Sequence, residues 1–181
     1  MAIGSPNFAQ NQKNNIQKEL VQWLNQNNSE HNTIINMKIE NIFKIYGQKK
    51  WLEIIRKHML IEINQLRSKS GSSEMKIDTI LNKIAQEHAQ DMVENDYLDH
   101  VDSQWRHIWD RAKDNEYKYY SISENIANDD NIKEVISGFV NSKIWWHEEI
   151  LSNEYENIWF GIAIDTGGNA YFVLNFAKPY K

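Results

Sequence analysis

Three residues of this chain have the chemistry to form a small polar site: His100, Glu124 and His147. His100 lies in the sequence DYLDHVDS, Glu124 in SISENIA and His147 in KIWWHEEIL. Two imidazoles and a carboxylate can exchange protons as general acid and base, or they can hold a divalent cation such as zinc. Catalytic zinc usually has three protein ligands, and these residues could supply three.

Glu124 stands between two isoleucines. In an extended segment, the side chains of Ile122, Glu124 and Ile126 point to the same face. A carboxylate there lies either at an exposed edge or partly buried among groups that donate hydrogen bonds to it. The donors could be the imidazoles of His100 and His147, or backbone N–H groups at the end of a strand. The pattern alone leaves both open.

The other histidines have simpler interpretations. His31 lies in a polar turn, and His58 and His107 lie in charged helical stretches, so we expect all three at the surface. His88 lies on an apolar helical stripe, where we expect a hydrogen-bonded histidine of the core.

Composition narrows the classes of protein. The chain has 181 residues, of which 41% are hydrophobic, which is enough for one folded domain with an appendage. The formal net charge is -5, without a long basic block, so no nucleic-acid partner is expected. No run of about 18 apolar residues occurs, so no transmembrane segment is expected. Without cysteine, the chain has no disulfides, thiol nucleophiles or thiolate metal sites.

Hydrophobic periodicity indicates which elements position the polar residues. Helical spacing predicts helices over residues 14–25, 33–46, 51–66, 78–93, 103–114 and 132–140. Residues 118–123 are β-prone, and residues 157–165 and 170–176 flank the turn TGGN, which predicts a hairpin. The sequence therefore predicts an α+β domain over residues 48–181, preceded by a helical extension over residues 1–47 that the domain does not need for folding.

Five short motifs follow Lys57 in a fixed order. They are AQEHAQDM (85–92) with His100 after it, ENIA (124–127), FVNS (139–142) leading to His147, FGIAI (160–164) and YFVLNF (171–176). Together they resemble the CAP superfamily of cysteine-rich secretory, antigen-five and pathogenesis-related proteins, in its cysteine-free bacterial form. The resemblance extends from about residue 57 to residue 179 and implies an α-β-α sandwich. The N-terminal extension has no counterpart in it.

The resemblance also implies a shallow cleft with two histidines and one or two glutamates. By motif, His100 is the first histidine, Glu124 is the glutamate and His147 is the second histidine. Ser142 stands where many members have a second glutamate. His147 lies two residues farther from Ser142 than the family's second histidine usually does.

Two more residues match positions near this cleft. Asn125 completes the Glu-Asn signature of the family. Arg111, in WDRAKDNEY, matches a basic position that is common after the first histidine, and we expect it to form a salt bridge that fixes the loop.

The resemblance implies a non-catalytic, extracytoplasmic module that binds a lipid, a sterol, or a host or surface protein. The aromatic runs YKYY (117–120) and Trp145-Trp146 could line an apolar pocket or pack in the core. The alternative is a metal-dependent hydrolase, with zinc held by His100 and His147. Because the chain has no HExxH motif and no recognisable Ser–His–acid context, we do not expect an enzyme.

The expected location depends on the start of the chain. The first 15 residues lack the charged start and the apolar middle of a signal peptide, which predicts a cytoplasmic protein if the chain is complete. The family resemblance instead implies a secreted protein or an outer-surface lipoprotein, of a kind found in spirochaetes.

Overall fold

The computed structural model describes residues 28–47, 50–141 and 146–180, so the helix predicted over residues 14–25 lies outside the described residues. The chain divides into two compact units, Met1–Ile34 and Ile35–Lys181. This division precedes the boundary that we predicted at residue 47. Whether the domain folds without residues 1–47 stays a prediction.

The segment predicted as one helix over residues 33–46 forms two. Helix α2 covers Asn28–Ile35 and helix α3 covers Ile39–Tyr46. Lys38, between them, has an extended backbone with φ -60° and ψ 136°, and it forms a β-bridge with Asn131. The N–H of Ile39 also donates to the carbonyl of Asp130 at 2.7 Å. Tertiary pairing therefore overrides the helical periodicity at this point.

A sheet of four strands forms the middle of the second unit. The strands are β1 (Lys76–Ile77), β2 (Tyr119–Asp129), β3 (Asn157–Ile164) and β4 (Ala170–Pro179), in the order β1-β3-β4-β2. Strands β3 and β4 form the predicted hairpin, β2 pairs antiparallel with β4, and β1 pairs parallel with β3. Strand β2 is longer than predicted because its polar second half also pairs with β4.

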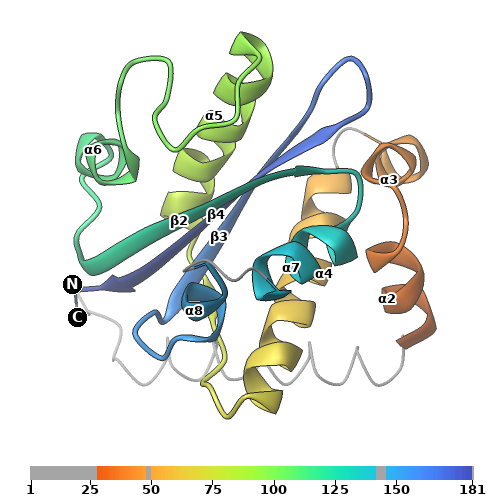
Figure 1. The fold of residues 1–181 in the computed structure, drawn as a ribbon, viewed down its shortest axis with the longest axis horizontal. Coiled ribbons are helices and arrows are strands. Elements are labelled where there is room, and N and C mark those ends of the chain that lie inside the picture. The colour runs from red at the N-terminus through yellow and green to blue at the C-terminus, as the bar shows by residue number, and fades with distance from the viewer. Residues whose placement is uncertain (1–27, 48–49, 142–145, 181) are drawn as a thin grey trace, which may run out of the picture. The chain divides into compact units, whose positions relative to one another are not determined.

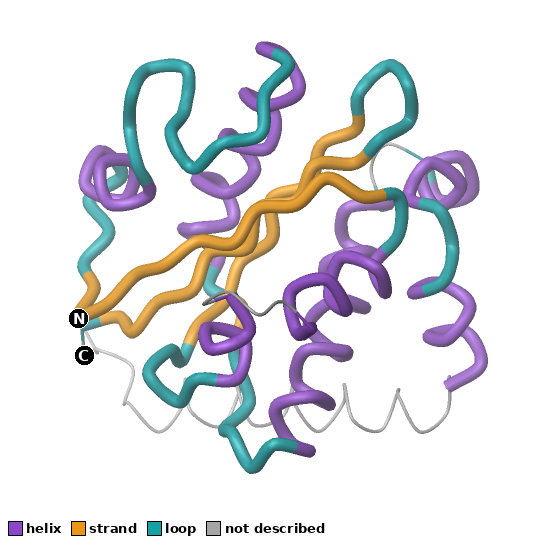
Figure 2. Tube along the Cα trace, viewed as in Figure 1, coloured by secondary structure: helices purple, strands orange, loops and turns teal. Residues whose placement is uncertain are grey.

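Helices cover both faces of this sheet (Figure 1, Figure 2). Helices α5 (Thr79–Asn95) and α6 (Ile108–Asp114) lie on one face. The other face carries α4 (Trp51–Lys69), α7 (Ile132–Asn141) and α8 (Trp146–Leu151), of which α8 was not predicted. The predicted α-β-α sandwich is confirmed.

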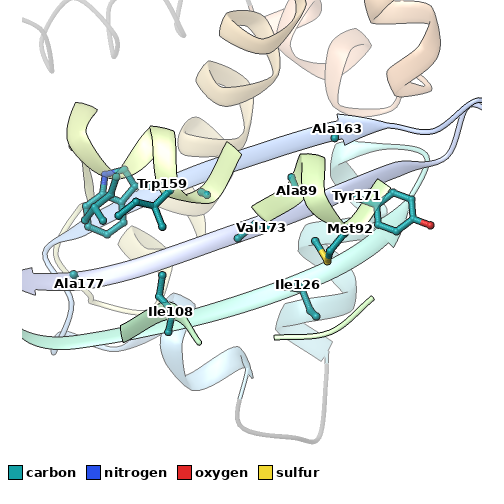
Figure 3. Close-up of a cluster of buried hydrophobic side chains, with 12 residues drawn as sticks. Ala89, Met92, Ile108, Ile126, Trp159, Ala163, Tyr171, Val173 and Ala177 are labelled. Carbon is teal, nitrogen blue, oxygen red and sulfur yellow. The ribbon is translucent and has the colours of Figure 1, made fainter. Parts of the chain in front are cut away.

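Helix α5 lies very close to strand β3. Buried side chains of α5, including Ala89 and Met92, belong to one apolar cluster with Trp159 and Val173 of the sheet (Figure 3). A Cβ atom added at Gly161 would lie 1.9 Å from the carbonyl oxygen of Ala85. Only glycine at residue 161 allows the helix backbone to pack against the strand at this distance.

Two histidines that we predicted at the surface are buried. His58 is 0% exposed because its helix, α4, is packed against α3, α7 and α8. His31 is 2% exposed and belongs to helix α2 instead of a polar turn. The core position predicted for His88 is confirmed, with 1% exposure.

The outer edge of β3 is occupied by side chains beyond the two residues that pair with β1. Nε of Arg56 donates to the carbonyl of Phe160 at 2.8 Å. Nε2 of Gln86 donates to the carbonyl of Ile162 at 2.7 Å, and its Oε1 accepts from the N–H of Ile162 at 3.2 Å. Nη2 of Arg56 also donates to Oε1 of Gln86 at 2.7 Å, which holds the two side chains together.

Candidate functional site

Glu124 is the centre of a buried polar cluster. Its Oε1 accepts a hydrogen bond from Nδ1 of His100 at 3.1 Å, and its Oε2 accepts one from Nη2 of Arg111 at 2.6 Å. The side chains of Glu124 and Arg111 are only 2% and 4% exposed, whereas that of His100 is 42% exposed. The carboxylate is therefore satisfied by side chains, and His100 forms the solvent-facing part of the cluster.

Three elements bring these residues together. Strand β2 carries Glu124, the loop after α5 carries His100, and helix α6 carries Arg111. Nη1 of Arg111 donates to the carbonyl of His100 at 3.3 Å and to the carbonyl of Arg106 at 3.0 Å. One guanidinium thus compensates the buried carboxylate and also fixes the loop that carries the histidine.

His88 lies behind the cluster. Its Nε2 is 3.0 Å from the carbonyl oxygen of Asp99, to which it can donate, and 3.8 Å from Oε1 of Glu124. Burial lowers the pKa of the His88 imidazole, although the charge of Glu124 opposes this effect. His88 is therefore neutral at physiological pH and supports the loop through Asp99.

Glu149, on α8, is a second carboxylate near His100. The hydroxyl of Ser123 donates to its Oε1, and its Oε2 is buried without a hydrogen-bond partner among the described residues. Burial raises the pKa of the Glu149 carboxyl, with a smaller opposing effect from His100. Sequence reasoning missed this residue because helix α8, which carries it, was not predicted.

The charge of His100 follows from these neighbours. The hydrogen bond with Glu124 raises the pKa of the His100 imidazole, against the opposing effect of partial burial, and the charges of Asp99 and Glu149 act in the same direction as Glu124. His100 therefore holds its proton to a higher pH than an isolated histidine does. We call Glu124, His100, Arg111 and Glu149 the Glu124 cluster.

The fold and the order of the motifs can now be compared with known proteins. The family model described as "CAP: Cysteine-rich secretory protein family" matches residues 60–176, which is more than half of the chain. The chain belongs to the cysteine-rich secretory protein family. The CAP domain predicted from the motifs is therefore confirmed.

Three of the related proteins and structures are bacterial. The chain is 27% identical over 141 residues to "Uncharacterized membrane protein YlbC" of Bacillus subtilis, covering 76% of this chain but only 39% of that protein. An outer surface protein of Borrelia burgdorferi has a TM-score of 0.64 at 23% identity, covering 68% of this chain and 92% of that one. An extracellular protein of Bacillus anthracis with an SCP domain has a TM-score of 0.63 at 19% identity, covering 70% and 41%. The two structures show the shared fold.

The remaining predicted site residues lie elsewhere or outside the described residues. Ser142 lies outside them, and of His147 only the backbone, in α8, is described. Asn125 is fully buried in the CAP domain, but it neighbours Glu124 in a strand, so its side chain points to the opposite face of the sheet. The structure thus brings together His100, Glu124 and Arg111, and it separates Asn125 from them.

The Glu124 cluster does not fit a zinc site. Both oxygens of Glu124 already accept hydrogen bonds, one of them from a cation, Arg111, that would repel a metal. Among the described residues, no group of three His, Cys, Asp or Glu side chains is placed to hold a metal ion. Zinc held by His100 and His147 stays a prediction.

The aromatic run over residues 117–120 lies mostly against the core. Tyr117 stacks on Tyr119 with ring centroids 6.3 Å apart and meets Trp159 edge-on at 5.7 Å. Tyr120 is 63% exposed and packs on Tyr180. For Tyr117 and Tyr119, the structure therefore supports core packing instead of a lipid pocket. Trp145 lies outside the described residues, and so does the side chain of Trp146.

Proposed function

We propose that this CAP domain is a non-catalytic module that acts outside the cytoplasm and binds the polar head of a lipid at His100. The most direct support is the imidazole of His100, which is about half exposed and forms a hydrogen bond with the buried carboxylate of Glu124. Arg111 compensates the charge of this carboxylate. When protonated, this imidazole, whose neighbouring carboxylate Glu124 is compensated by Arg111, is suited to bind an anionic or oxygen-bearing group of a ligand.

The same contacts argue against hydrolysis. A general base needs a free lone pair near the substrate, but Glu124 is buried and uses both oxygens. A serine nucleophile needs a base to activate it, and the hydroxyl of Ser123 donates to the carboxyl of Glu149 instead of an imidazole.

The extracytoplasmic location is part of the proposal. It rests on the two related structures, one described as an outer surface protein and the other as an extracellular protein. Among the described residues, no helix is long and apolar enough to cross a membrane. Secretion and a lipid anchor are two alternatives for how the domain is placed there.

Titration with decanoate tests the proposed ligand class, and decanol, which has the same chain length without a carboxylate, is the control ligand. We expect decanoate to shift the amide NMR signals of residues near His100 and to bind more tightly than decanol. His100→Ala should abolish this preference, whereas His107→Ala, which removes a partly exposed histidine of the same loop, should keep it.

The pH dependence separates this proposal from the zinc hypothesis. Decanoate needs the protonated imidazole, so its affinity should fall as the pH rises through the raised pKa of His100. Zinc needs neutral imidazoles, so its affinity should instead fall as the pH decreases through the raised pKa of His100. Zinc-dependent turnover of an ester such as p-nitrophenyl acetate that is lost in His100→Ala would refute the proposal in favour of the hydrolase.

A further inference from the structure

Trp105 has a conformation and an exposure that stability alone does not explain. The side chain is 87% exposed, and the backbone φ is 63°, in the left-handed region. For a residue other than glycine this region costs roughly 1–2 kcal/mol. Backbone strain of this kind is concentrated at functional sites, so an exposed tryptophan that carries it is a candidate binding residue.

The loop is built to hold Trp105 in this state. Its N–H donates to the carbonyl of Asp102 at 2.9 Å. Oδ1 of Asp102 accepts the N–H groups of Gln104 at 3.0 Å and Arg106 at 2.8 Å, and Nε of Arg106 donates to Oδ2 of Asp102 at 2.9 Å. Asp102 is only 6% exposed. The ring is therefore presented to solvent by a rigid turn.

A pocket of about 330 Å³ lies beside this turn. Trp105 itself does not line the pocket, but its two neighbours in sequence, Gln104 and Arg106, do, together with Gln90 and Glu94 of α5. The lining consists of carboxylate, amide, hydroxyl, imidazole and guanidinium groups. A ligand with several hydroxyl groups would find many hydrogen-bond partners in such a pocket.

The wall also contains two polar atoms without partners among the described residues. Nδ1 of His88 and Nε of Arg111 are buried and make no hydrogen bond, although both residues line the pocket. Because Nε2 of His88 is placed to donate to Asp99, Nδ1 is left as an acceptor, while Nε of Arg111 is a donor.

We propose that this pocket and Trp105 form a binding site for a neutral saccharide. One sugar ring stacks on Trp105, and hydroxyl groups of the sugar bind Gln90, Glu94 and Arg106. The pocket lining holds the acidic residues Glu87, Asp91, Glu94 and Asp102 but only the cations Arg106 and Arg111, so sulfated glycans and lipid phosphates are disfavoured. The site goes beyond the proposed function, which uses the exposed side of His100.

The test uses cellotriose and N,N′,N″-triacetylchitotriose as neutral probes, each titrated to about 20 mM into the full chain and followed by amide NMR. We expect at least one probe to shift signals of residues 87–94 and 103–106. Trp105→Ala should weaken its binding about tenfold, which corresponds to about 1.4 kcal/mol. Trp105→Phe, which keeps an aromatic ring, should lose less.

Trp109→Ala is the matched control, because Trp109 is a second exposed tryptophan, 51% exposed, whose two neighbours in sequence, Ile108 and Asp110, do not line the pocket. It should change the affinity less than twofold. The absence of shifts with both probes, or an equal loss in Trp105→Ala and Trp109→Ala, would overturn the proposal. Binding of a sulfated heparin oligosaccharide more tightly than either neutral probe would also contradict the proposal. So would Trp105-dependent binding to phosphatidylcholine vesicles if neither saccharide binds. Because the decanoate titration reports on His100, either proposal can fail without the other.

Discussion

Replacing Arg111 by methionine should destabilise the domain strongly, because it leaves the carboxylate of Glu124 buried without its cation. The two charged groups are 2.6 Å apart, and their side chains are 4% and 2% exposed. At an effective dielectric constant of about 20, this distance corresponds to about 6 kcal/mol of attraction, much of which offsets the desolvation of the two ions. Removal of one partner from such a pair typically costs about 3–5 kcal/mol.

Chemical denaturation with urea measures this cost. A total free energy of unfolding of about 5–15 kcal/mol is typical, so Arg111→Met should remove a large part of it and lower the melting temperature by roughly 6–20 °C. The double variant Arg111→Met/Glu124→Gln should be more stable than Arg111→Met alone, because it removes the stranded charge.

Lys83→Met is the control, because it removes a cation from an ion pair with Glu87 whose two side chains are 66% and 60% exposed. Exposed ion pairs contribute about 0–1 kcal/mol, so its cost should be small. The reasoning would be refuted if Arg111→Met cost less than about 1 kcal/mol, or if adding Glu124→Gln destabilised it further.

Three further predictions concern other parts of the domain. Gly161→Ala should cost at least about 3 kcal/mol in urea denaturation, since its Cβ would lie 1.9 Å from a backbone oxygen. Gly138→Ala in helix α7, where nothing lies within 4 Å of the added atom, should be neutral or stabilising. Equal costs of the two variants would contradict this prediction. Glu149→Gln should raise the melting temperature at pH 7.5 but not at pH 4. Burial raises the pKa of the Glu149 carboxyl, so this group destabilises the fold increasingly as the pH rises above its unfolded pKa of about 4.3. A gain of the same size at both pH values would exclude burial of the charge as the cause. Trp105→Gly should be about 1 kcal/mol more stable than Trp105→Ala, because glycine adopts the φ of 63° without strain, and calorimetry that found no difference would argue against strain at this residue.

Periodicity was sufficient for the long elements of the fold. Helices α4, α5 and α7 and the β3–β4 hairpin have regular apolar patterns, and the structure places them within a few residues of the predicted ranges. Strand β1 has two residues, which is too short to produce a pattern. The second half of β2 is rich in Asn and Asp, which disfavour strands in isolation, and it is extended because β4 pairs with it.

The polar cluster was only partly predictable for a different reason. The motifs indicated His100, Glu124 and a salt bridge of Arg111, but that this salt bridge is formed with Glu124 depends on how α6 packs against β2. Glu149 is 25 residues beyond Glu124 in the sequence, on the unpredicted helix α8. Contacts of this kind are set by tertiary packing, which periodicity does not encode.

The side chains along the outer edge of β3 affect how this protein behaves when it is concentrated. An unpaired strand edge offers its N–H and C=O groups to another molecule, and this is a common start of aggregation. Here Arg56 and Gln86 use the groups of Phe160 and Ile162 that a foreign strand would need. An incoming chain would first have to displace these hydrogen bonds, one of which comes from a cation. The domain can therefore leave a long apolar strand at the border of its sheet and still resist strand pairing with a second molecule at high concentration.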